Sequence, residues 1–186
     1  MRVVLFFTLV MSYFALNTTH IQYEGLKEVT QAPKLSLANQ VFMGRIFRVI
    51  DGDSIRIIIP LFEDYYEYSF RVLGVDTPEI RSGNVRQFGR DVRDIVRSML
   101  GTCIVKVEAG AFDKYGRPLG QIYFRDAHGE EWNLKDYLID HQMGKPYDGG
   151  KKVPFIAEDY QSFQETYTHY QWPECVDMPY PISDIF

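Results

Sequence analysis

Residues 41–60, VFMGRIFRVIDGDSIRIIIP, decide the fold because they hold two apolar runs on either side of a short polar turn. Val41–Ile50 and Ser54–Pro60 are rich in branched residues, which favour β-strands. A glycine between two carboxylates, Asp51-Gly52-Asp53, is typical of a tight turn between antiparallel strands. This stretch therefore predicts a β-hairpin near the start of the folded domain.

The pattern beyond this hairpin predicts more strands and a small set of helices. Apolar and aromatic residues predict three further strands, over Tyr65–Val75, Cys103–Ala109 and Leu119–Phe124. Helical spacing predicts three helices, over Arg86–Leu100, Leu134–Met143 and Ile156–Tyr170. Gly101 is expected to cap the first helix. Because helices do not alternate with the strands, the expected fold class is α+β, a five-stranded β-barrel with about three packed helices.

The length and composition indicate a single globular domain. The chain has 186 residues, of which 46% are hydrophobic and 24% are charged, which excludes a disordered or low-complexity protein. No apolar stretch reaches about 18–20 residues, which excludes a polytopic membrane protein. The net charge of −5 argues against binding nucleic acid through bulk positive charge. The acidity lies in residues 156–186, which hold no Lys or Arg, so specific residues of the neutral body must hold any ligand.

Residues 1–20 are predicted to be a signal peptide or an N-terminal anchor, followed by a polar linker over residues 21–40. Arg2 precedes an apolar run at residues 3–16, and a run of that length is typical of an export signal. At ~1.5 Å per residue the run spans roughly 21 Å, less than the ~30 Å hydrocarbon core. If this segment is cleaved as a signal peptide, we expect a secreted or periplasmic protein. No Ala-x-Ala stands near Asn17, so a membrane anchor through residues 3–16 stays open, as does a buried element of the domain.

The two cysteines, Cys103 and Cys175, leave two alternatives open. In an exported protein they can pair, and the bridge would tie the C-terminal tail to the body. Alternatively, Cys103 is a buried free thiol, since it lies in an apolar strand pattern. Two cysteines and four scattered histidines do not make a zinc site.

Three short segments concentrate residues that carry chemistry: residues 51–54 (DGDS), 71–79 (RVLGVDTPE) and 113–117 (DKYGR). Carboxylates from separate turns, beside a hydroxyl or carbonyl oxygen, suit a hard cation such as Ca²⁺ or Mg²⁺. Arginines add the charge that holds a phosphate and stabilises its transition state. A free carboxylate can position and activate a water molecule. Each segment alone is a weak signal, and the three together predict phosphoryl chemistry.

These segments resemble the staphylococcal (micrococcal) nuclease family. Its members carry an Asp-Gly-Asp-Thr turn, then Arg-x-x-x-Val-Asp-Thr-Pro-Glu, then Asp-x-Tyr-Gly-Arg, and Ser54 stands here in place of the threonine. The resemblance covers residues 41–155 and includes the later loop 146–151. It implies a five-stranded oligonucleotide-binding barrel (OB-fold) with packed helices. The acidic, aromatic extension 156–186, with its expected helix, lies outside the shared motifs.

The resemblance also implies a Ca²⁺ site and a base. Asp53 and Asp76 would bind Ca²⁺ through their carboxylates, and Thr77 would bind it through its backbone carbonyl. Glu79 would be the general base, or the residue that orients the attacking water.

On the same basis, five further residues would bind the substrate. Arg71 and Arg117 would bind the scissile phosphate and stabilise its transition state. Lys114 and Tyr115 match positions that contact a terminal phosphate, and Tyr147 would stack on a base.

The expected function is that of an exported, Ca²⁺-dependent phosphodiesterase, an endonuclease that cuts DNA and RNA with little sequence specificity and leaves 3′-phosphate ends. We expect a monomer with no stable protein partner, at a membrane only if the N-terminal segment is uncleaved. One alternative is a catalytically silent module on the same fold that binds nucleic acid or protein, and another is a structural calcium site. The presence of both arginines and the full carboxylate set favours the enzyme.

Overall fold

The computed structural model describes residues 25–81 and 85–179. The export segment expected at residues 1–20 lies outside these ranges. The chain divides into two compact units, Met1–Leu35 and Ser36–Phe186. In the described part of the first unit, residues 25–28 are helical. None of the helices within the described ranges combines the length and apolarity that a membrane crossing needs.

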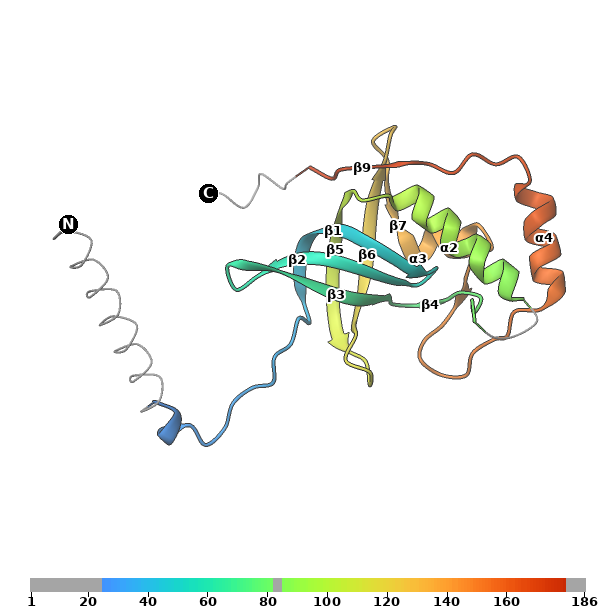
Figure 1. The fold of residues 1–186 in the computed structure, drawn as a ribbon. Helices are drawn as coiled ribbons and strands as arrows, with labels where there is room; N and C mark the ends of the chain where they lie inside the picture. Colours follow the sequence, from blue (N-terminus) through green and yellow to red (C-terminus); the bar gives the residue numbers. More distant parts are fainter. Residues whose placement is uncertain (1–24, 82–84, 180–186) are drawn as a thin grey trace, which may run out of the picture. The chain divides into compact units, whose positions relative to one another are not determined.

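Five long strands of the second unit close into a barrel, as the sequence predicts (Figure 1). They are β1 (Gln40–Asp51), β2 (Ser54–Leu61), β3 (Asp64–Val72), β5 (Ile104–Phe112) and β6 (Pro118–Asp126). β1 to β3 form an antiparallel meander, β5 pairs with the other edge of β1, and β6 pairs with β5. A short parallel pairing of β3 with β6, through Arg71 and Leu119, closes the barrel.

The third strand is shorter than the predicted Tyr65–Val75, because the chain turns sharply at Gly74. This glycine has φ 90°, a left-handed conformation that residues with a Cβ rarely adopt. β3 therefore ends at Val72, and β4 (Val75–Asp76) leaves the barrel to pair with β8 (Lys145–Pro146). Two more short strands, β7 (Glu131–Asn133) and β9 (Cys175–Val176), pair with β6.

Three helices of the second unit lie where the periodicity predicts them. They are α2 (Arg86–Leu100), α3 (Leu134–Asp140) and α4 (Ala157–Tyr167). α2 ends as predicted at Gly101, whose N–H donates to the Arg97 carbonyl. α3 and α4 are shorter than predicted, and the chain turns after α3 at Gln142, which has φ 60°. The fold is thus the expected α+β barrel with packed helices.

The core lies between the inner face of the barrel and the apolar face of α2. Val92, Val96 and Leu100 of α2 are fully buried there, as the helical spacing predicts. Leu37, near the end of the segment predicted as a linker, is fully buried in the same core. Gly52 lies against this helix so closely that an added Cβ would be 2.7 Å from Val92 Cγ1. The β1–β2 turn is therefore fixed on α2.

The C-terminal tail is attached to the body by aromatic packing and by a disulfide. The Phe88 ring of α2 lies 5.1 Å, centre to centre, from the rings of both Tyr160 and Phe163 on α4. Cys103 and Cys175 form a disulfide with their Cα atoms 6.2 Å apart. Of the two alternatives that the sequence leaves open for the cysteines, the structure has the paired one.

Candidate functional site

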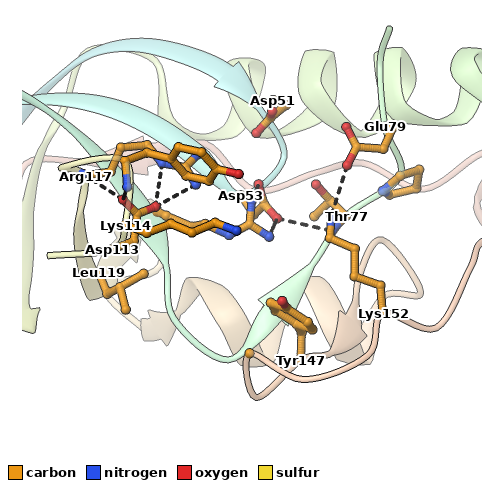
Figure 2. A pocket seen from close by; sticks show the side chains of 14 residues that line it. Asp51, Asp53, Thr77, Glu79, Asp113, Lys114, Arg117, Leu119, Tyr147 and Lys152 are labelled. Carbon is orange, nitrogen blue, oxygen red and sulfur yellow. Dashed lines mark hydrogen bonds and ion pairs between the residues drawn. The ribbon is translucent and has the colours of Figure 1, made fainter. Parts of the chain in front are cut away.

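One end of the barrel carries a cleft of about 500 Å³ at which the three motifs meet (Figure 2). The β1–β2 turn, the end of β3 and the β5–β6 turn all open into it, although they are far apart in sequence. Every residue predicted for the site lines the cleft except Asp76, whose Oδ1 accepts a hydrogen bond from the cleft residue Arg71. The lining side chains come from Asp51, Asp53, Arg71, Thr77, Pro78, Glu79, Asp113, Lys114, Tyr115, Arg117, Leu119, Tyr147 and Lys152, with Gly149 beside them.

Arg71 is the central cation of the site, and it is held by two buried carboxylates. Its guanidinium donates from Nη1 to Asp53 Oδ1 at 3.1 Å, and Nη2 lies 2.8 Å from Asp53 Oδ2. The same Nη2 donates to Asp76 Oδ1 at 2.9 Å. Burial alone would lower the pKa of Arg71, but Asp53 and Asp76 raise it above its ordinary value. Arg71 is therefore a fixed positive charge whose orientation is set before any ligand arrives.

Three carboxylates, those of Asp51, Asp53 and Asp76, lie close together around Arg71. Burial, followed by repulsion from Asp51, raises the pKa of Asp53 to about 8, although Arg71 opposes this shift. Asp51 Oδ1 is buried and has no hydrogen-bond partner within residues 25–81 and 85–179. The site therefore holds more acceptor oxygen than its own donors satisfy, which suits a cationic ligand.

Thr77 and Glu79 follow Asp76 on a segment packed between the β1–β2 turn and α2. The Thr77 backbone N–H donates to Asp53 Oδ2 at 3.3 Å. On the other side, an added Cβ on Gly89 would lie 2.4 Å from the Pro78 carbonyl oxygen, so only a glycine allows α2 to come this close. The backbone that carries Glu79 is thus fixed, while the Glu79 side chain itself is 60% exposed.

Arg117 is oriented by Asp113, a residue of the third motif to which the sequence analysis gives no role. Arg117 Nε and Nη2 lie 2.8 Å and 2.7 Å from Asp113 Oδ2. Asp113 Oδ1 accepts from the backbone N–H groups of Tyr115 and Arg117, which shapes the β5–β6 turn. Burial would raise the pKa of Asp113, but these hydrogen bonds and the Arg117 guanidinium lower it. Asp113 therefore stays ionised and keeps Arg117 facing the cleft.

The residues predicted to contact substrate lie at the rim of the cleft. Tyr115 is 73% exposed, with Lys114 Nζ 5.1 Å and Arg117 Cζ 5.6 Å from its ring centre. Tyr147 lies on the other side of the opening, its backbone N–H donating to the Gly74 carbonyl and its ring centre 6.0 Å from Arg71 Cζ. Aromatic rings beside cations at the rim of a cleft are suited to stacking on bases and holding phosphates.

Lys152 is a site residue that the sequence analysis misses. Its Nζ lies 2.8 Å from Asp76 Oδ1 and 3.0 Å from Glu79 Oε1, and Figure 2 shows it beside Thr77 and Glu79, across the opening from Arg117. Burial would lower the pKa of Lys152, but both carboxylates raise it. Lys152 follows Lys151 directly, and no sequence signal distinguishes the two lysines.

The donor set fits a hard cation by its chemistry. Ca²⁺ prefers carboxylate and carbonyl oxygens, and Asp53, Asp76 and the Thr77 backbone are next to one another here. Within the described ranges, no group of three or more His, Cys, Asp or Glu side chains is arranged to hold a metal. The predicted set has only two such side chains, and both are engaged by Arg71.

A closed five-stranded barrel with arginines and carboxylates round one opening defines a small α+β protein with a highly charged cleft at one end. The chain belongs to the staphylococcal nuclease family, because the family model for staphylococcal nuclease homologues matches residues 69–164. This membership confirms the resemblance seen in the motifs and the OB-fold expected from it.

Relatives with curated descriptions agree with this assignment. An uncharacterized endonuclease of Escherichia coli O157:H7 is 32% identical over 96 residues, which are 52% of this chain and 55% of that protein. Endonuclease YhcR of Bacillus subtilis (strain 168) is 30% identical over 154 residues, covering 75% of this chain and 12% of that protein. Protein ParB of Escherichia coli is 31% identical over 80 residues, which are 43% of this chain and 41% of that protein. The matched region thus spans about half of the first relative and far less of the second.

Proposed function

We propose that this protein is an exported, Ca²⁺-dependent endonuclease that hydrolyses DNA and RNA with little sequence preference and leaves 3′-phosphate ends. The observation that carries the proposal is the meeting of Arg71 and Glu79, from the segment 71–79, with Arg117, from the β5–β6 turn, round one cleft beside buried carboxylates. The names of the relatives from Escherichia coli and Bacillus subtilis, both endonucleases, support the same activity.

The two arginines would bind the scissile phosphate. Arg71 and Arg117 are each oriented by a carboxylate, so little conformational freedom is lost when a phosphate arrives. Their charges would neutralise the negative charge that develops on the phosphate oxygens in the transition state. Asp53, Asp76 and the Thr77 carbonyl would hold Ca²⁺, which when bound would add further Lewis-acid stabilisation there.

Glu79 would position the attacking water and accept its proton. Its side chain is exposed to solvent at the cleft while its backbone is fixed by Gly89. The water oxygen would form a new bond to phosphorus as the bond from phosphorus to the 5′ oxygen breaks. The phosphate then stays on the 3′ side, and the departing 5′ oxygen takes up a proton.

Export is supported by the disulfide between Cys103 and Cys175. Disulfides persist in secreted and periplasmic proteins and are rare in the reducing cytosol. With the apolar run at residues 3–16, this favours a secreted or periplasmic location, and an anchor through that run is the alternative.

The test is digestion of single-stranded DNA, duplex DNA and RNA by the purified chain with its disulfide formed. Each substrate is incubated with Ca²⁺, with Mg²⁺ or with a chelator, and Arg117→Ala controls for contaminating nuclease. We expect Ca²⁺-dependent cleavage that is lost in the variant, with products that a 5′-kinase labels without prior phosphatase treatment, because cleavage that leaves a 3′-phosphate leaves a free 5′-hydroxyl. A folded protein that binds these nucleic acids without cutting them in any ion would instead be a binding module on the same fold.

A further inference from the structure

Lys152 joins the two carboxylates to which the proposed function gives separate tasks. Its Nζ lies 2.8 Å from Asp76 Oδ1 and 3.0 Å from Glu79 Oε1. Asp76 is a proposed Ca²⁺ ligand, and Glu79 is the proposed base. In this structure a single ammonium group therefore engages both the metal ligand and the base.

The loop that carries Lys152 is tied down at both ends, which brings the lysine to this place. At its start, β8 pairs with β4 so that Lys145 lies opposite Asp76, and the Tyr147 N–H donates to the Gly74 carbonyl. At its far end, the Pro154 carbonyl accepts from Lys145 Nζ at 3.0 Å. A loop closed in this way loses little entropy when Lys152 reaches the carboxylates. The fold of this loop therefore determines the contact of Lys152 with the two carboxylates.

A positive charge is electrostatically favoured at the position of Lys152. The Asp76 side chain is only 8% exposed, and its Oδ1 already accepts from Arg71 at 2.9 Å. Buried carboxylates are costly unless cations neutralise them, and this end of the barrel holds Asp51, Asp53 and Asp76 together. Lys152 supplies positive charge where a divalent ion would supply it. Its side chain is 46% exposed, so its ammonium group has a direct path from the carboxylates into solvent.

We propose that Lys152 is an internal counter-ion that neutralises Asp76 and Glu79 in the metal-free protein and must be displaced by Ca²⁺. It therefore weakens Ca²⁺ binding and keeps Glu79 engaged until the metal arrives. This inference rests on the proposed function, because it takes Asp76 as a metal ligand. It adds a device by which the chain's own lysine sets the Ca²⁺ concentration at which the site becomes competent.

The test compares Lys152→Gln with Lys151→Gln, the adjacent exposed lysine, which has no hydrogen bond or ion pair with any described residue. Ca²⁺ binding is measured by titration calorimetry, and thermal unfolding is followed with and without Ca²⁺. We expect Lys152→Gln to bind Ca²⁺ about tenfold more tightly, within the usual range of coupling between two sites. We also expect it to melt at a lower temperature than the wild type without metal and to recover in Ca²⁺. Lys151→Gln should match the wild type in both measurements.

Equal or weaker Ca²⁺ binding by a folded Lys152→Gln would overturn the inference. If that variant fails to fold, Lys152→Arg replaces it and should bind Ca²⁺ no more tightly than the wild type, so tighter binding would refute the counter-ion role. If the wild-type protein binds no Ca²⁺, both this inference and the Ca²⁺ dependence of the proposed nuclease activity are refuted. Tighter binding by Lys152→Gln in a protein that cuts no nucleic acid would support the counter-ion role and refute the nuclease.

Discussion

Arg71 and Asp53 are joined by two parallel contacts, of 3.1 Å and 2.8 Å, between residues 18 positions apart in sequence. This pair connects the end of β3 to the β1–β2 turn, and it is the point at which two of the three sequence motifs meet. A planar guanidinium matches a carboxylate in this way, whereas an ammonium group offers a single point charge. The identity of residue 71 therefore matters as much as its charge.

Arg71→Lys is the variant that separates charge from geometry. We expect nuclease turnover to fall by about 100-fold or more, because lysine keeps the charge but cannot hold Asp53 and a phosphate with fixed geometry. Initial rates on single-stranded DNA in Ca²⁺ measure this effect, with circular dichroism as the check on folding. A folded Arg71→Lys with wild-type turnover would show that only the charge is needed.

Arg117→Ala tests the second arginine, which lies on the β5–β6 turn and not in the core. We expect turnover to fall by roughly 10²–10³-fold, since a donor to the transition state is lost. The fold should persist, because Arg117 lies outside the hydrophobic core and its ion pair is with Asp113 of the same turn. Arg97→Ala on α2, an exposed arginine paired with Asp94, is the matched control and should keep full activity. Equal effects of the two substitutions would remove Arg117 from the site.

Glu79→Gln tests the base, because glutamine keeps the shape of the side chain and loses its ability to accept a proton. We expect kcat to fall much more than the affinity for a cleavage-resistant substrate. The two quantities are measured by single-turnover kinetics and by fluorescence anisotropy. If both fall by the same factor, Glu79 serves only to hold its segment in place.

The raised pKa of Asp53 predicts how Ca²⁺ binding depends on pH. Burial and Asp51 raise this pKa from 3.8 to about 8 although Arg71 opposes the shift, so the folded metal-free protein binds a proton at Asp53 more tightly than the unfolded chain does. The contribution of Asp53 to stability is therefore full below pH 3.8 and is lost as the pH rises through about 8. Ca²⁺ needs the carboxylate form, so its affinity should rise from pH 6 to pH 8 with release of a proton. Calorimetry in two buffers of different ionisation enthalpy measures that proton, and an affinity that does not change with pH would contradict the prediction.

The disulfide should stabilise the protein without contributing to the cleft. The bridged cysteines are 72 residues apart, and neither lines the candidate site. Replacing both by serine should lower the free energy of unfolding by about 2–5 kcal/mol. Denaturant unfolding measures this loss, and nuclease activity at low temperature should be unchanged. An activity loss in a fully folded double variant would show that the tail acts on the site.

Much of the fold follows from local sequence patterns. Branched residues about a Gly-centred turn predict β1 and β2, and the apolar spacing of Val92, Val96 and Leu100 predicts α2 to its last residue. These signals are local, because alternation and helical spacing act over a few residues. The three motifs also predict which side chains share the cleft, although their catalytic and metal-binding roles remain predictions.

Features that depend on distant contacts are not visible in the sequence. The sequence around Gly74 has the pattern of one continuous strand. The break there is not visible, because β4 pairs with β8, whose residues are about 70 positions away. Leu37 lies in a polar stretch of sequence that predicts a linker, yet its side chain is fully buried in the core. Lys152 reaches Asp76 only because its loop is closed by that same β4–β8 pairing. The tertiary structure, and not the local composition, determines that Lys152 and not Lys151 contacts the site carboxylates.

The bridge between Cys103 and Cys175 also governs what a protease can do to this protein. The bridged span of 72 residues includes the β5–β6 turn, α3, α4 and the exposed loop with its two adjacent lysines. A single cut in that loop leaves two fragments that are still covalently joined, each held to the other by the barrel and the disulfide. After such a cut the nicked molecule would run as one species under non-reducing conditions, heavier by one water molecule, and denaturation would separate its two fragments only when a reductant is present.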